Sequence, residues 1–583
     1  MALNYAAQFN VRKPKEACPQ SQAIPGSTQV ANSGGGFSWQ VTPWQKLERF
    51  LILGAEGGTY YVGEKDLVKQ SHDAVLACLK ENGQHVVKMV VDVSTSGRAY
   101  KNDPAVFVLA LATCHGDQET KQAAYAAVTR VCRIGTHLFH FAEYVNAMRG
   151  WGRGLRDAVA RWYAKPADKL AYQAVKYQAR DGWSHADLLR LAHPKADDAR
   201  QEAVFRWMLK GMDAFLTSGP HTVKRKVKGV LVEKTYADGP GLEFLPEAIA
   251  AFEDAKKADE KALVKLITEH DLPREAIPTE RLNSAKVWEA LLENMPMTAM
   301  IRNLGKMTSI GLIGPLSRAQ KLVVERLGDK ERLKNGRVHP MQVLLALKTY
   351  AAGHGFKGAL TWRPQAQVVD ALDKAFYATF GNVVPCNKPV LLALDVSGSM
   401  DGTMIAGTNL SAREGAAAMA LITAATEPQY ELIAFAAASL GLGGKWGGGE
   451  SGIVPVKVSP RMSLADVVSV MQRIPMGGTD CSLPFTWARK NKLSVAGFVT
   501  YTDSETWAGA IHPAQALRQY RNDFVEDARG IVVGMTAGSF TVADPTDRWM
   551  LDIVGFDANV PGIISDFIRG GALPVSASED EAM

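Results

Sequence analysis

Apolar positions recur at helical spacing through the first two thirds of the chain. In residues 66–79, Val68, Val75 and Leu79 stand seven and then four positions apart, so they share one face of a helix. The same pattern recurs at 104–114, 117–133, 153–163, 167–180, 284–295, 298–307, 339–352 and 366–380. Strand-like alternation is scarce in this part. Short helices joined by short turns predict an α-solenoid of helix pairs, although the sequence has no repeat of fixed period.

The pattern changes at Pro389. Residues 390–394 form an uninterrupted apolar run, which is typical of a strand buried on both faces of a parallel sheet. Further strand patterns at 431–435, 496–500, 530–533 and 551–554 alternate with helical patterns at 412–425, 463–474, 513–521 and 561–568. Strand–helix alternation predicts a doubly wound α/β sheet, which binds ligands at the carboxyl ends of its strands.

These patterns predict a multidomain α plus α/β fold in three parts. Residues 1–37 are polar and rich in Gly, Pro and Ser, so we expect a flexible N-terminal segment. Residues 38–386 form the helical part, and residues 387–583 form the α/β domain. Within the helical part, residues 221–234 mix Lys and Arg with valines, which predicts an inserted basic hairpin or loop.

Composition is that of a globular protein, with 47% hydrophobic and 22% charged residues. No apolar run is long enough for a membrane helix, and the first residues lack a signal-peptide pattern, so we expect a cytoplasmic protein. Six scattered cysteines without a CxxC pair argue against a disulfide framework or a zinc site.

Charge is unevenly distributed along the chain. Residues 387–583 hold 14 Lys and Arg against 21 Asp and Glu, a net charge of −7, whereas residues 1–386 carry a net charge of +13. Residues 121–230 alone hold 20 basic and 9 acidic residues. Such a concentration is expected of a surface that binds a polyanion, although solvated helix faces would have the same composition.

A candidate metal site follows the first buried strand of the α/β domain. Asp395 offers a carboxylate there, and the hydroxyls of Ser397 and Ser399 stand at alternate positions of a tight turn. Two later strand ends, 477–480 and 501–503, add a hydroxyl and a second carboxylate. Oxygen ligands with few formal charges suit Mg²⁺. Although these residue types are common in turns, here they follow strands of one sheet, so we favour a divalent-cation site.

This arrangement resembles the metal-ion-dependent adhesion site of von Willebrand factor type A domains, and the resemblance covers residues 387–583. It implies a cation held by Asp395, Ser397, Ser399, Thr479 and Asp503, with Asp480 as a weaker candidate. Sites of this kind capture a partner's carboxylate rather than catalyse a reaction.

Two enzymatic interpretations are weaker. The glycine-rich residues 441–449 contain no P-loop motif, so they indicate a loop rather than a nucleotide site. A hydrolase would need a nucleophile with a positioned base, and the nearest histidine of this domain is His512, far from Asp395 in sequence.

The basic excess is richest between residues 148 and 194. Lys176 and Arg180 stand four positions apart, so on a helix they would share a face and contact adjacent phosphates. Gly182 would end that helix, and Ser184 would cap the next one. The candidate phosphate contacts of this stretch are Lys176, Arg180, Arg190 and His193. Its tryptophans are interpreted as packing residues rather than base-stacking platforms: Trp151, Trp162 and Trp183.

Several runs resemble the TROVE module of the Ro ribonucleoprotein autoantigen family and its bacterial relatives. They are residues 42–66, 182–193 (GWSHADLLRLAH), 286–308 and 337–355, and the resemblance spans about 38–386. It implies a ring of HEAT-like repeats, closed by the type A domain. Such a ring binds small noncoding Y RNAs on its basic outer surface and the 3′ ends of misfolded RNA in its hole. Lys176, Arg180 and His193 fall on the family's RNA-contacting positions, while residues 221–246 depart from the family pattern.

The leading hypothesis is a noncatalytic, monomeric RNA-binding protein that acts in RNA quality control, with Mg²⁺ as its cofactor. Bacterial relatives imply an exoribonuclease tethered through the RNA as a partner. One alternative is a metal-dependent adhesion or complex-assembly protein that binds an acidic protein partner, and another is a metal-dependent nuclease. RNA that copurifies with the protein would separate the first two hypotheses, and RNA shortened in Mg²⁺ would indicate the third.

Overall fold

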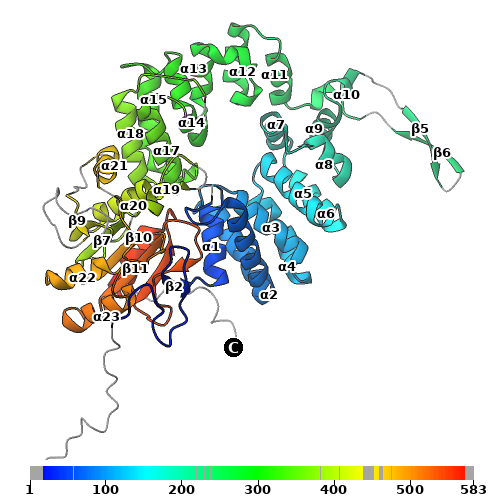
Figure 1. Ribbon diagram of the computed structural model, residues 1–583. Coiled ribbons are helices and arrows are strands. Elements are labelled where there is room, and N and C mark those ends of the chain that lie inside the picture. Colours follow the sequence, from blue (N-terminus) through cyan, green and yellow to red (C-terminus); the bar gives the residue numbers. More distant parts are fainter. Residues whose placement is uncertain are drawn as a thin grey trace, which may run out of the picture. The chain divides into compact units, whose positions relative to one another are not determined.

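The computed structural model describes residues 17–570 except 57, 217–220, 228–229, 237–238, 357, 381–382, 406–407, 438–451, 458–461, 463, 475 and 558. The glycine-rich residues 441–449 therefore lie outside the described residues. The chain divides into two compact units (Figure 1). The helical unit comprises Asp73–Thr379, and the sheet unit combines Met1–His72 with Phe380–Met583.

The helical unit is a succession of short helices joined by turns (Figure 1). A longer helix, α2 (Glu64–Ser96), is interrupted at Asn82 and leads into it. The helices that follow are α3 (Asp103–His115), α4 (Gln118–Val131), α5 (Gly135–Arg149), α6 (Arg153–Tyr163), α7 (Ala167–Lys176), α8 (His185–Ala192), α9 (Ala199–Lys210), α10 (Asp213–Leu216), α11 (Glu247–Ala255), α12 (Glu260–His270), α13 (Ala285–Glu293), α14 (Met297–Ser309), α15 (Arg318–Gly328), α16 (Lys330–Asn335), α17 (Pro340–Ala352) and α18 (Ala366–Ala378).

Each of these helices packs mainly on helices close to it in the chain. Thus α3 contacts α4 and α5, α4 contacts α6, and α6 contacts α8. In α6 the apolar stripe that the sequence predicts is buried, because Leu155, Ala158, Val159 and Trp162 have no solvent-accessible surface. The predicted series of packed helices is confirmed, and its closure into a ring stays a prediction. None of the described helices is long and apolar enough to cross a membrane.

The basic insertion is a hairpin. Strand β5 (His221–Val227) pairs antiparallel with β6 (Val230–Tyr236), with His221 opposite Tyr236 and Val227 opposite Val230. This decides between the two predicted alternatives, a hairpin and a loop, in favour of the hairpin.

The sheet unit is built on a six-stranded sheet in the order β13-β11-β10-β7-β8-β9. The first five of these strands are parallel, and β9 is antiparallel to β8. The strands are β7 (Val390–Asp395), β8 (Tyr430–Phe435), β9 (Ile453–Pro455), β10 (Gly497–Thr502), β11 (Arg529–Gly534) and β13 (Met550–Val554). The helices of the unit are α1 (Pro43–Leu53), α19 (Gly398–Gly402), α20 (Ala412–Thr426), α21 (Leu464–Gln472), α22 (Leu483–Lys490), α23 (Pro513–Asp523) and α24 (Val560–Arg569).

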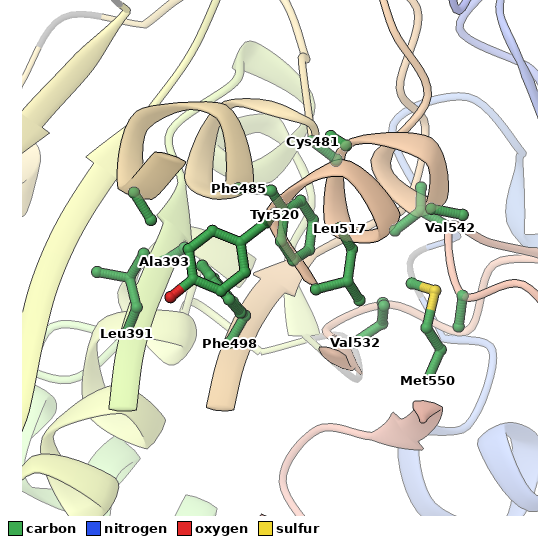
Figure 2. Packing of buried hydrophobic residues seen from close by; sticks show 14 of the residues in the cluster. Leu391, Ala393, Cys481, Phe485, Phe498, Leu517, Tyr520, Val532, Val542 and Met550 are labelled. Atoms are coloured by element: carbon green, nitrogen blue, oxygen red, sulfur yellow. The ribbon is translucent and has the colours of Figure 1, made fainter. Parts of the chain in front are cut away.

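Helices cover both faces of this sheet, as the sequence predicts. On one face, Leu391 of β7 and Phe498 of β10 pack against α22 and α23 in one apolar cluster, which Figure 2 shows from close by. On the opposite face, the Tyr501 hydroxyl lies 3.0 Å from the Thr423 hydroxyl of α20. The run at 390–394 is fully buried because it forms a central strand with parallel neighbours on both sides.

The expectation of a flexible N-terminal segment is wrong for residues 17–37, which pack on the sheet unit. A second sheet joins β1 (Val30–Ala31) and β2 (Phe37–Gln40) to β12 (Phe540–Thr541). Cys18, Ile24 and Trp39 belong to the same apolar cluster as β7 and α23. The segment lacks a periodic apolar pattern because little of it is helix or strand. Side-chain hydrogen bonds, such as those of Gln20 and Asn32, attach it to loops of the sheet unit.

Candidate cation and RNA-binding sites

The predicted metal-binding motif lies where β7 ends and α19 begins. Asp395 is the last residue of β7, and its Oδ1 accepts a hydrogen bond from the Ser397 N–H at 2.9 Å. Ser397 directly precedes α19, and its Oγ lies 3.1 Å from Oγ of Ser399. The side chains of Asp395, Ser397 and Ser399 are all buried. One carboxylate and two hydroxyls therefore converge at the carboxyl end of a central strand.

The end of β10 adds a second carboxylate to this group. Because β10 pairs directly with β7, Thr502 lies next to the motif and donates a hydrogen bond of 2.6 Å to Asp395 Oδ2. Asp503 follows Thr502, and the nearby Ser399 side chain lowers the pKa of its carboxyl against the larger effect of burial. The structure thus brings together Asp395, Ser397, Ser399 and Asp503, as the sequence predicts, although their role as ligands stays a prediction.

The third predicted loop borders the same site. Gly477 forms a β-bridge with Ser397, which brings the loop against the motif. The carbonyl oxygen of Thr479 accepts hydrogen bonds from the N–H groups of Trp507 and Ala508, at 3.1 and 3.0 Å. Asp480 is occupied elsewhere, since its Oδ1 accepts hydrogen bonds from Gln20 and Ser482.

The carboxylates of this site are electrostatically unfavourable without a counter-charge. Burial and the neighbouring Asp503 charge raise the pKa of Asp395 to about 7, and burial also raises the pKa of Asp503. Burial and Asp503 likewise raise the pKa of Glu505 to about 7. Buried like charges destabilise each other's ionised form, and a bound cation would relieve that repulsion.

The donor set fits a hard divalent cation. Carboxylate and hydroxyl oxygens are the ligands that Mg²⁺ accepts, and Mg²⁺ keeps several waters in its coordination shell. Across the described part of the chain, no three His, Cys, Asp or Glu side chains converge closely enough to hold a metal ion by themselves. A cation here would therefore need the serine and threonine hydroxyls as well as the two aspartates.

Three residues near this site were not predicted from the sequence. Thr502 bonds to Asp395, as described above. Glu505 accepts hydrogen bonds from the N–H groups of Ser33 and Gly34, and the Tyr61 phenol lies beside Ser399. Thr502 could have been found, because it ends a predicted neighbouring strand. The contacts of Glu505 and Tyr61 join residues more than 300 positions apart, so no local pattern indicates them.

The predicted phosphate contacts lie around α7 and α8, but not on one helix face. Helix α7 ends at Lys176, since Tyr177 has φ −124° and ψ 70°. Arg180 lies instead in β3 (Ala179–Arg180), which pairs with β4 (Trp183–Ser184). The expectation that Lys176 and Arg180 share a helix face is therefore wrong.

A two-residue hairpin turn explains this difference. Asp181 and Gly182 both have positive φ, at 52° and 80°, which is the conformation that Asp-Gly favours between two short strands. Asp181 Oδ2 also lies 3.0 Å from Nε2 of His140. Gly182 thus forms a turn rather than ending a helix, and the Asp-Gly pair was the signal in the sequence.

Helix α8 separates two of the predicted contacts. Ser184 caps it in a capping box with Asp187, as predicted, and His193 ends it in the left-handed conformation. The eight residues of α8, roughly 12 Å of helix, thus lie between Ser184 and His193, and Arg180 precedes them in the β3–β4 hairpin. Arg180 and His193 are exposed, as is Arg190, which lies 3.4 Å from Asp187.

Lys176 is held by aromatic side chains. Its Nζ donates a hydrogen bond of 2.9 Å to the Tyr172 hydroxyl and lies over the rings of Tyr172 and Tyr177. Burial lowers the pKa of Lys176, but the hydrogen bond to Tyr172 and the neighbouring acidic groups outweigh it, so the pKa is raised. Lys176 therefore keeps its positive charge at neutral pH in an oriented position.

The tryptophans of this region are packing residues, as predicted. Trp162 is fully buried and donates to the Cys132 carbonyl at 2.5 Å. Trp151 and Trp183 stack on each other with ring centroids 5.9 Å apart, and Trp183 donates to Glu143.

Comparison with known proteins accounts for both units. Residues 30–349 match the TROVE domain family, and residues 389–568 match the family described as the Ro60 vWA domain. The chain is 40% identical to RNA-binding protein RO60 of Deinococcus radiodurans, over 95% of this chain and 97% of that protein. It is 34% identical to RNA-binding protein RO60 of Caenorhabditis elegans, over 93% of this chain and 90% of that protein. The crystal structure of the Deinococcus radiodurans RO (RSR) protein matches with a TM-score of 0.64 and 39% identity, over 91% of this chain and 100% of that structure.

Proposed function

This chain belongs to the Ro60 family of TROVE-domain proteins, and we propose that it binds RNA through the basic surface of its helical unit without catalysing a reaction. Its RNA would be a small noncoding RNA of the Y type, bound around α8. The single-stranded 3′ ends of misfolded RNA would enter the hole of a ring of helical repeats. In this proposal the protein acts as a monomer in RNA quality control, with an exoribonuclease tethered through the bound RNA.

The observation that carries this proposal is the concentration of positive charge on one part of the helical unit. Residues 121–230 hold 20 basic and 9 acidic residues, while the α/β domain is net negative. Exposed Arg180, Arg190 and His193 lie at or on α8 within this stretch. Release of counterions by such contacts drives RNA binding. The relatives named as RNA-binding proteins support the same conclusion.

The geometry assigns different phosphates to the different side chains. Because Arg180 lies in the hairpin before α8 and His193 ends α8, they would contact separate phosphates rather than clamp one. Lys176 is oriented by Tyr172 before RNA binds, so less side-chain entropy is lost on binding.

We also propose that the end of β7 holds a divalent cation. Asp395, Ser397 and Ser399 would ligate it together with Thr479 and Asp503, and the ion would supply positive charge that offsets the buried carboxylates. The chain's own residues prepare the site, because Thr502 orients Asp395 and the turn at Ser397 directs both hydroxyls to one side.

The test of RNA binding is a charge-removal experiment on the full chain. The triple variant Lys176→Ala, Arg180→Ala, His193→Ala should bind a Y-like RNA about 30- to 1,000-fold more weakly, since each phosphate contact contributes on the order of 1 kcal/mol. A matched control removes two basic side chains and one histidine from ion pairs on α12 and α13, as Lys265→Ala, Lys286→Ala, His270→Ala. The control should change affinity less than about threefold, because those charges lie outside the basic stretch.

Two outcomes would contradict the proposal. Equal losses in the two triple variants would show that only net charge matters. Unchanged affinity in the first variant would exclude α8 as the contact surface. Nuclease-sensitive absorbance near 260 nm in protein purified from cells provides an independent measurement of bound RNA.

A further inference from the structure

The first described residues of the chain are built into the surroundings of the candidate cation site. We call residues 17–62 the N-terminal arm and residues 503–509 the β10 loop. The Asn32 side chain donates to the Thr506 carbonyl at 2.7 Å, and the Ser38 hydroxyl donates to the Ser504 carbonyl at 3.1 Å. Both bonds are buried. The arm therefore holds the backbone of the loop that begins with Asp503.

Glu505 provides a second link between the arm and the β10 loop. Its Oε2 accepts hydrogen bonds from the N–H groups of Ser33 and Gly34, at 2.8 and 3.2 Å. The two segments touch closely here, since a Cβ on Gly34 would lie 2.9 Å from the Glu505 carbonyl oxygen and 3.4 Å from the Tyr61 hydroxyl. A side chain at position 34 would therefore require the Glu505 backbone of the loop to move.

Tyr61 brings the end of the arm onto a predicted ligand. Its phenol lies beside the Ser399 side chain, and burial together with the nearby charges of Asp503, Glu505 and Asp395 raises the pKa of Tyr61. The preceding residue, Tyr60, is attached differently: its backbone N–H donates to the Thr403 hydroxyl at 2.9 Å, while its side chain is 59% exposed. Of the two neighbouring tyrosines, Tyr61 is therefore the one whose hydroxyl faces the site.

The contact between Tyr61 and Ser399 matters because a serine hydroxyl can form only a few bonds. A serine hydroxyl has one proton and two lone pairs. Ser399 Oγ lies 3.1 Å from Ser397 Oγ, and the phenol of Tyr61 and the carboxylate of Asp503 are further polar neighbours. If Ser399 gives one lone pair to a cation, its remaining partners decide where that lone pair points. A phenol held against Ser399 thus orients a ligand, in the way that outer partners commonly orient metal ligands.

We propose that Tyr61 is a positioning residue of the cation site, and that cation binding and docking of the N-terminal arm stabilise each other. The inference rests on the proposed cation at Asp395 and is independent of RNA binding. Binding linkage is reciprocal, so an ion that binds more tightly when the arm is docked must also hold the arm in place. A bound ion would then also stabilise the docked position of the N-terminal arm on the β10 loop.

The test compares two neighbouring tyrosines in the full chain. Mn²⁺ affinity, measured by electron paramagnetic resonance, should fall roughly tenfold in Tyr61→Phe, because the polar neighbour of a ligand is lost while the ring remains. Tyr60→Phe is the matched control and should bind Mn²⁺ within about twofold of the unsubstituted protein, because Tyr60 is largely exposed.

A second measurement follows the arm itself. Saturating Mn²⁺ should slow amide hydrogen exchange in residues 31–36 and 58–62 of the unsubstituted chain, and should have no such effect in Asp395→Ala. An Mn²⁺ affinity of Tyr61→Phe equal to that of the unsubstituted protein would overturn the proposal. Tighter binding would also overturn it, because the phenol would then compete with the ion. If the unsubstituted chain binds no Mn²⁺, the cation site and this inference fail together, while RNA binding is untouched.

Discussion

The buried ion pair between Arg49 and Asp552 offers a direct test of whether the first helix of the TROVE region folds with the sheet unit. Arg49 lies on α1, and its Nη2 donates to both carboxylate oxygens of Asp552 on β13 at 2.8 Å. Its Nη1 donates to the carbonyls of Gly538 and Phe540 at 2.9 and 3.0 Å. The two side chains are 1% and 4% exposed, so water cannot replace either partner.

Arg49→Met keeps most of the side-chain volume but leaves the Asp552 carboxylate and two carbonyls without their donor. Breaking a buried pair in this way costs about 3–5 kcal/mol. The unit has roughly 270 residues and unfolding entropy is about 2.1 cal/mol/K per residue, so its melting temperature should fall by about 5–9 °C. Calorimetry is the appropriate assay, because a chain with two units can unfold in more than one step.

The double variant Arg49→Met, Asp552→Leu distinguishes the pair from general damage to the core. Replacing both partners by apolar side chains removes the uncompensated charge, so most of the lost stability should return. A single variant that unfolds within about 1 °C of the unsubstituted protein would refute the reasoning, because it would mean that α1 contributes little to the sheet unit.

Four further predictions follow from the two sites. Lys176→Ala should reduce the slope of log RNA affinity against log salt by roughly 0.7–1, measured by titration at several salt concentrations, whereas an unchanged slope would remove Lys176 from the interface. Gly182→Ala should destabilise the helical unit by about 1 kcal/mol, because φ is +80° although a Cβ meets nothing within 4 Å. It should also weaken RNA binding severalfold without changing charge, and retention of full affinity would show that the turn does not position Arg180. Asp395→Ala with Ser397→Ala should abolish Mn²⁺ binding by the full chain, and stoichiometric binding in that variant would place the ion elsewhere. The pKa values of Asp395 and Glu505 are raised to about 7 from ordinary values of 3.8 and 4.5, so between these pH values the folded unit binds protons that the unfolded chain releases. Cation-free protein should therefore unfold at a lower temperature at pH 8 than at pH 5. Saturating Mg²⁺ should reduce that difference in melting temperature.

Local patterns were sufficient for many of the regular elements of both units. The apolar run at 390–394 predicts β7 because a central parallel strand is buried on both faces, so successive residues of the strand are apolar. The buried stripe of α6 is visible for the same reason, since one face of the helix meets its neighbours. The carboxyl ends of β7 and β10 were then predictable as one site, because parallel neighbours end at the same edge of a sheet.

The errors arise where a short-range or a very long-range interaction decides the structure. The apolar spacing at 167–180 predicts one continuous helix. The turn preference of Asp181-Gly182 instead forms a short hairpin, which places Arg180 on a strand. The N-terminal arm shows the opposite case. Gln20 donates to Asp480 at 2.8 Å, a contact between residues 460 positions apart. Polar, glycine-rich composition indicates a loop, and it does not indicate which distant surface satisfies the loop's hydrogen bonds.

The division of the sequence into families therefore differs from the division of the structure into units. The TROVE match begins at residue 30, yet β1, β2 and α1 fold with the von Willebrand factor A sheet. A fragment that begins at residue 387 would lack Trp39 from the apolar cluster and leave Asp552 without Arg49. It would also lack Tyr61 and the backbone donors to Glu505 beside the candidate cation site. The sheet unit is thus complete only when residues 17–72 fold together with residues 380–570, and this is why the experiments on the proposed cation require the full chain.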